Sequence, residues 1–120
     1  MKKLLLTLLF ILIYNPLSYA GSLEDLKISN ILAQLNLDTT ESGNLNVEVW
    51  ENNIEKLENK ELKQQWYNVL LGQLNLNVTQ GGSLEVDLWE NYIQKLSDKE
   101  LQQQWKMVLN SQKVLKSISN

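Results

Sequence analysis

The sequence predicts an all-α protein of about five helices, built from a tandem helical-hairpin repeat of about 39 residues. One observation is an internal duplication: residues 31–70 align with residues 70–109, and 23 of the 40 paired positions are identical. A period of roughly 20 to 50 residues is typical of stacked units that bury their apolar faces against one another. The second observation is that apolar residues within each copy recur with the period of an α-helix.

The first twenty residues have the three parts of a secretory signal peptide. Two lysines follow the initial methionine, residues 4–13 form an apolar run, and Ser18 and Ala20 supply a small-residue exit. The run is shorter than the roughly 20 residues that span a bilayer. We therefore expect a signal peptide over 1–20, cleavage after Ala20, export to the periplasm or the outside of the cell, and no membrane span afterwards.

The remaining residues, 21–120, are enough for one domain with a single modest core. In the register of the duplication this domain reads as a half repeat over 21–37, whole repeats over 38–76 and 77–115, and a short C-terminal tail over 116–120.

The first expected helix, over 22–35, is an earlier copy of the second helix of the unit. Four of its apolar residues match those of the next copy: Leu23, Ile31, Leu32 and Leu35 correspond to Leu62, Leu70, Leu71 and Leu74. Lys27 stands where the later copies have a tryptophan. An atypical first helix is what the cap of a helical array shows.

The segments that join the units, 35–49 and 74–88, leave two alternatives open. Apolar residues alternate there with period two, which is a strand signal, and Gly43 and Gly82 lie where a β-hairpin needs a left-handed residue. Each repeat would then begin with a hairpin, and the fold would be α+β. We prefer the all-helical version, because isolated hairpins are marginally stable.

In the all-helical version Asn44 and Ser83 act as N-caps of helices that already include Leu45 or Leu84.

Each repeat contains a helical hairpin. In the second copy a single face predicts a helix over 86–97, formed by Leu88, Trp89, Tyr92, Ile93 and Leu96. Ser97 and Glu100 have the spacing of a capping box, which predicts that a new helix begins there. That helix places apolar residues on one side, namely Leu101, Trp105, Val108 and Leu109.

Composition excludes much chemistry. The sequence contains no cysteine, histidine or arginine, so it lacks the usual zinc ligands, the thiol nucleophile and the commonest general base. We expect no disulfide, no metal, no cofactor and no catalytic residue. The net charge is −3 for the chain and about −5 after residue 20, which excludes nucleic acid as an expected partner.

The only candidate binding residues are the four tryptophans, Trp50, Trp66, Trp89 and Trp105. Aromatic rings can line a ligand groove, but residues that recur with the repeat more often fill the space between helices. We therefore interpret them as core. Acidic residues recur too, including Glu51 and Glu90, and are expected on a solvated helix face.

These features suggest two functions. The first is an exported, non-enzymatic binding or scaffold protein that uses a helical-repeat surface to hold a protein or peptide partner. The alternative is a secreted effector, inhibitor or immunity-type protein that acts on a target enzyme.

Overall fold

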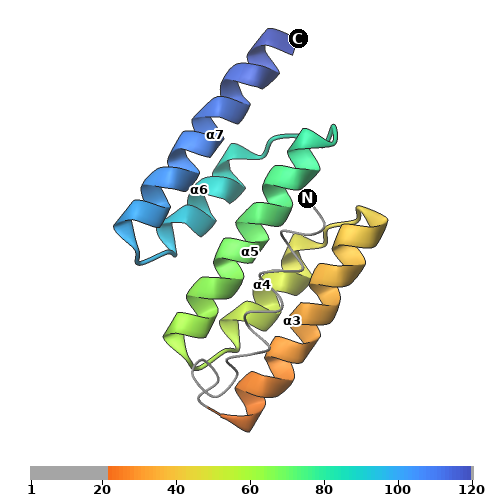
Figure 1. The fold of residues 1–120 in the computed structure, drawn as a ribbon, viewed down its shortest axis with the longest axis vertical. Helices are drawn as coiled ribbons and strands as arrows, with labels where there is room; N and C mark the ends of the chain where they lie inside the picture. The colour runs from red at the N-terminus through yellow and green to blue at the C-terminus, as the bar shows by residue number, and fades with distance from the viewer. Residues whose placement is uncertain (1–21, 120) are drawn as a thin grey trace. The chain divides into compact units, whose positions relative to one another are not determined.

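The computed structural model describes residues 22–119, and within them it contains helices and no strand (Figure 1). Five helices follow one another: α3 (Leu23–Ser42), α4 (Val47–Glu55), α5 (Lys60–Thr79), α6 (Val86–Gln94) and α7 (Lys99–Ser119). The all-α prediction of five helices is confirmed, and the α+β alternative is wrong. The signal peptide and the cleavage after Ala20 lie outside the described residues.

The first joint is a helix end and not a hairpin. α3 continues to Ser42, so the period-two pattern at its end lies on a helix. Gly43 has φ +77°, and its N–H donates to the Thr39 carbonyl at 2.8 Å. This is the αL C-cap, which needs a left-handed residue just as a hairpin does.

The second joint ends α5 with a Schellman motif. Gly81, not Gly82, is the left-handed residue, with φ +104°. The Gly82 N–H donates to the Asn77 carbonyl at 2.8 Å, and the Gly81 N–H donates to the Val78 carbonyl at 3.0 Å. These two bonds satisfy carbonyls that the helix itself leaves unpaired.

The N-caps of the short helices lie two residues after those expected at Asn44 and Ser83, and α6 begins at Val86, where its face pattern predicted. α4 has Asn46 as its N-cap, whose Oδ1 accepts from the Val49 N–H at 3.3 Å, so Asn44 is not the cap. α6 has Glu85 in that position, so Ser83 is not the cap either. In α4, Asn46 has the short polar side chain that can reach the N–H three residues ahead, where a cap is needed.

The capping box predicted at Ser97 is also displaced. α6 ends at Gln94 rather than 97, and the N-cap of α7 is Asp98, whose Oδ1 accepts from the Leu101 N–H at 3.0 Å. Asn59 does the same for the Leu62 N–H of α5 at 2.9 Å. Asp and Asn cap helices at least as well as Ser, and here each stands three residues before the first leucine of its helix.

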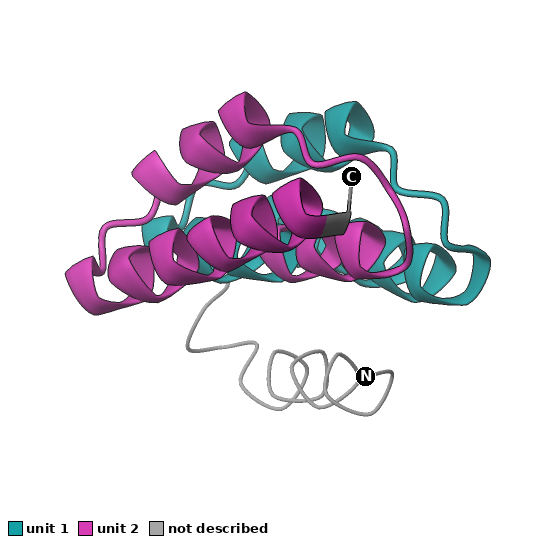
Figure 2. Ribbon diagram, turned by 90° about the horizontal axis from the view of Figure 1, so that it is seen from above, with its two compact units in different colours: residues 1–70 teal, residues 71–120 magenta. Residues whose placement is uncertain are grey.

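The chain divides after Leu70 into two compact units (Figure 2). In the first, α3 packs against α4, and the N-terminal half of α5 belongs to the same unit. In the second, α6 packs against α7. α4 and α6 begin 39 residues apart, at Val47 and Val86, and so do α5 and α7, at Lys60 and Lys99. The single domain of stacked repeats stays a prediction.

Each unit has its own buried apolar residues. In the first they are Ile28, Leu32, Trp50, Ile54, Leu57, Leu62, Trp66, Tyr67, Val69 and Leu70. In the second they are Leu71, Leu74, Val78, Trp89, Tyr92, Ile93, Leu96 and Leu109.

The two glycines of α5 and its cap should respond oppositely to alanine. A Cβ at Gly82 would meet the Asn77 side chain and lie 2.8 Å from the Asn77 carbonyl oxygen, so Gly82→Ala is expected to destabilise the protein by about 1–3 kcal/mol. Gly72 lies inside α5, where a Cβ meets nothing within 4 Å. Gly72→Ala is therefore expected to stabilise by about 0.5–1 kcal/mol. Urea denaturation of both variants tests the pair, and equal effects would contradict the cap geometry.

Candidate functional site

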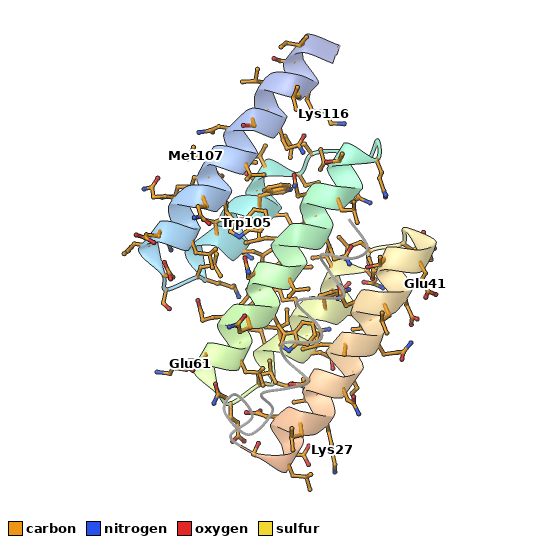
Figure 3. The ribbon with its side chains drawn as sticks, viewed as in Figure 1. Lys27, Glu41, Glu61, Trp105, Met107 and Lys116 are labelled. Atoms are coloured by element: carbon orange, nitrogen blue, oxygen red, sulfur yellow. The ribbon has the colours of Figure 1, made fainter. Side chains whose placement is uncertain are left out.

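The tryptophans form one pair in each unit. Trp50 and Trp66 meet edge to face, with ring centroids 6.3 Å apart, and Trp89 and Trp105 do the same at 6.2 Å. Trp50, Trp66 and Trp89 are enclosed by protein. Trp105, which Figure 3 labels on α7, is half-buried. A ligand could stack on the first three rings only after a core had opened.

A buried carboxylate ties two helices of the first unit together. Asp25 is fully buried, and its two oxygens accept from the backbone N–H groups of Glu58 and Asn59, both at 2.9 Å. Asn59 is the N-cap of α5, so Asp25 on α3 fixes the segment from which α5 starts. Both oxygens are occupied by backbone donors, and the arrangement therefore has a structural role. Sequence reasoning missed Asp25.

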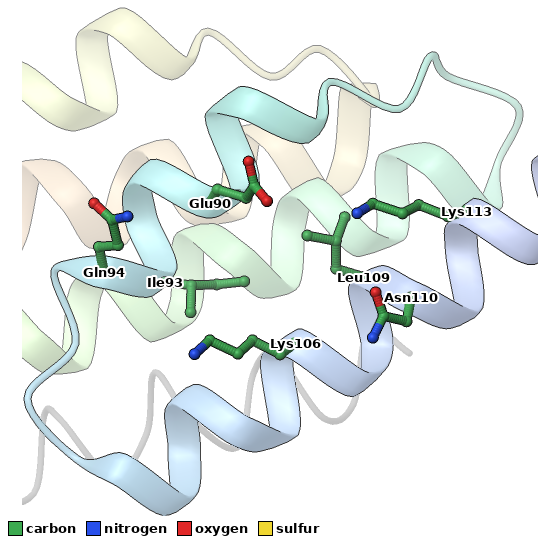
Figure 4. Close-up of a pocket in the computed structure, with 7 residues that line it drawn as sticks. All are labelled: Glu90, Ile93, Gln94, Lys106, Leu109, Asn110 and Lys113. Carbon is green, nitrogen blue, oxygen red and sulfur yellow. The ribbon is translucent and has the colours of Figure 1, made fainter.

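A concave site that could hold a ligand is a groove between α6 and α7, in the second unit (Figure 4). Its volume is about 370 Å³. Ile93 and Leu109 form its apolar floor and are buried. Its polar rim is exposed and comprises Glu90 and Gln94 from α6, and Lys106, Asn110 and Lys113 from α7.

Helical spacing explains why these residues share one groove. On α6, Glu90 precedes Ile93 by three residues and Gln94 by four. On α7, positions 106, 109, 110 and 113 follow the same rule over two turns. Residues three and four apart are neighbours on a helix surface, so each helix contributes one side of the groove.

The rim is a feature of the last hairpin and not of the repeat. The α7 side of the groove rim is formed by three exposed residues, Lys106, Asn110 and Lys113. The residues 39 positions earlier in α5 are apolar or aromatic and buried: Tyr67, Leu71 and Leu74. The residues that form the α7 side of the groove are therefore ones that differ between the two copies. The tryptophans, which were the candidates from the sequence, are ones that the copies share.

The rim has both signs of charge. Two ammonium groups lie on the α7 side and the Glu90 carboxylate on the α6 side, and none of them makes an ion pair within residues 22–119. Gln94 and Asn110 add amide donors and acceptors. The groove can therefore take an apolar side chain on its floor while the lysines meet carboxylates of the same ligand.

Over the described residues, no three carboxylates come together in a way that could hold a metal ion. None of the helices in this part of the chain combines the length and apolar character that crossing a membrane requires. The chain matches no family model, and no curated protein or solved structure is significantly similar to it.

Proposed function

We propose that the protein is an exported, non-enzymatic binding or scaffold protein that holds a protein partner in the groove between α6 and α7. The observation that supports this most directly is that corresponding positions are buried in α5 and exposed in α7. α5 buries Tyr67, Leu71 and Leu74, whereas α7 exposes Lys106, Asn110 and Lys113 in the same register.

The shape of the groove favours a helical segment of the partner. Two neighbouring helices present a furrow into which the side-chain ridge of a third helix fits. The floor supplies apolar contact through Ile93 and Leu109, and the polar rim keeps the groove soluble while it is empty.

The charges favour an acidic partner. Lys106 and Lys113 are exposed on the α7 side of the groove, and Lys113 points across it toward the side of Glu90 (Figure 4). Carboxylates that flank an apolar residue on the partner would meet them, and because the rim is exposed, such contacts act mainly on the association rate and weaken with salt. The absence of histidine and cysteine from the sequence supports binding over catalysis.

Site-specific photocrosslinking tests the proposal. A photoreactive residue in place of Asn110, in the protein exported by its own cell, is expected to form a covalent adduct with one partner. The double variant Lys106→Glu/Lys113→Glu is expected to reduce that adduct by at least about tenfold, because it reverses the charge of the rim.

The matched control is Lys56→Glu/Lys60→Glu, which makes the same change in net charge at two exposed lysines of the first unit. It should leave the adduct unchanged. No adduct at Asn110, or an equal loss in both double variants, would show that the groove does not hold a partner.

A further inference from the structure

The first half of α7 is held in the second unit by buried contacts. Leu109 is 3% exposed, and Trp105 meets the buried ring of Trp89 edge to face. The Gln102 side-chain amide donates to the Ile93 carbonyl of α6 at 3.2 Å. Separating this half of α7 from α6 would expose apolar core, and it would therefore require a large free energy.

The second half of α7 differs, because none of residues 110–118 is buried. Seven of the nine are exposed, and Gln112 and Lys116 are half-buried. In the register of the duplication this stretch corresponds to residues 71–79 of α5. The α5 stretch buries three apolar side chains: Leu71, Leu74 and Val78. A helical segment that buries no apolar side chain is stabilised mainly by its own backbone hydrogen bonds, and such segments open at a low free energy.

The sequence of residues 110–118 adds little helical stability of its own. It is rich in residues with low helix propensity: Asn110, Ser111, Val114, Ser117 and Ile118. The Ser117 hydroxyl donates to the Val114 carbonyl at 2.8 Å, and a side chain that bonds back to the helix backbone slightly weakens the helix. Attachment to the rest of the second unit is therefore needed to keep this stretch in place.

Polar bridges supply that attachment. The Gln112 side-chain amide donates to Asn75 Oδ1 at 2.8 Å and to Thr79 Oγ1 at 3.3 Å, both near the end of α5. The Lys116 ammonium donates to the Gly82 carbonyl at 3.0 Å. Water can replace these partners when the bridges break, so each bridge contributes only modestly to stability, and the attachment is reversible.

Residues 110–118 also carry part of the groove. Asn110 and Lys113 line its α7 side, and Lys113 points across it toward the side of Glu90 (Figure 4). Leu109, which forms the floor with Ile93, comes immediately before this stretch. Opening of the stretch would therefore remove Lys113 from the rim and leave the apolar floor in place.

We propose that residues 110–119 form a latch segment, which opens while the core between α6 and the first half of α7 stays folded, and which completes the rim of the groove when it closes. A partner that contacts Lys113 binds the closed form better than the open form, so partner binding and closure favour each other. The opening follows from the contacts of the chain itself, whereas its coupling to a partner rests on the proposed function. The latch segment thereby regulates the groove.

Amide hydrogen exchange of the protein, measured residue by residue by NMR, tests the opening. Residues 112–115 lie at least one turn inside the end of α7. After correction for intrinsic rates, their amides are expected to be at least about tenfold less protected than those of their counterparts, residues 73–76. Gln112→Ala/Lys116→Ala removes both bridges, so it is expected to lower the protection of the latch segment by at least about a further fivefold and to leave α6 unchanged. Alanine is the better helix former, so an effect of helix propensity alone would have the opposite sign.

The matched control is Ser111→Ala/Val114→Ala, which changes two exposed positions of the latch segment and should not lower its protection. Equal protection of residues 112–115 and 73–76 would overturn the proposal, and so would a bridge variant that exchanges no faster than the wild type.

The coupling to a partner has its own readout. When the partner that crosslinks at Asn110 is bound, exchange in the latch segment should slow down. A bound partner that leaves this exchange unchanged would refute the coupling, although the groove would still hold the partner. The absence of an adduct at Asn110 would contradict the proposed function and with it the coupling, whereas exchange in the free protein tests the opening separately.

Discussion

Replacing Trp66 by alanine is expected to lower the free energy of unfolding by about 3–5 kcal/mol, the largest effect of any single substitution considered for this protein. Trp66 is 1% exposed and packs edge to face on Trp50 in the core of the first unit. Removing the indole leaves a cavity as well as losing the transfer free energy of the ring. Urea denaturation followed by far-ultraviolet circular dichroism measures the loss without relying on tryptophan fluorescence.

Two controls make this prediction specific. Trp105 occupies the corresponding position in the second copy but is half-buried, so Trp105→Ala should cost clearly less than Trp66→Ala. The Nε1 atoms of Trp50 and Trp66 are buried without a hydrogen-bond partner. Trp66→Phe removes such an atom and keeps much of the ring volume, so it should cost much less than alanine. Equal costs for Trp66→Ala and Trp105→Ala would contradict the burial of Trp66.

Replacing Asp25 by alanine is expected to destabilise the protein by about 3 kcal/mol. The change removes the acceptor of two backbone N–H groups, those of Glu58 and Asn59, and leaves them unpaired. Hydrogen bonds to a charged group are stronger than those between neutral groups. The loss should appear as a lower urea midpoint with an unchanged slope.

Asp25→Asn should fall between the wild type and Asp25→Ala, because an amide keeps one acceptor oxygen but turns a donor toward the other N–H. Glu41→Ala removes an exposed acid from the same helix and should change stability by no more than about 0.5 kcal/mol. If Asp25→Ala lowered the free energy of unfolding no more than Glu41→Ala, the Asp25 carboxylate would not be the group that holds the start of α5 in place.

Much of the fold could be predicted because the duplication and the helical period act over long segments. Face patterns such as that of Trp89, Tyr92 and Ile93 are averaged over several turns, so α6 and α7 were predictable to within a few residues. The joints were harder because their signals are short. A left-handed glycine serves a hairpin and a helix C-cap equally well, so Gly43 alone could not distinguish them.

The groove and the buried acid were not predictable for different reasons. The four tryptophans were the candidate binding residues because they recur in both copies, yet three of the four are core residues in the structure. The rim of the groove depends on residues that differ between the two copies, such as Tyr67 and Lys106. This difference indicates a binding site only because the structure shows that Lys106 is exposed. Asp25 bonds to groups more than thirty positions away, a distance over which helical periodicity carries no information.

Binding of a partner in the groove between α6 and α7 can be tested by hydrogen exchange with and without that partner. When the partner that crosslinks at Asn110 is bound, amide exchange should be slower in α6 and in α7 around Leu109, with little change in α3 and α4. Protection confined to α3 and α4, or exchange that the partner leaves unchanged throughout, would contradict it.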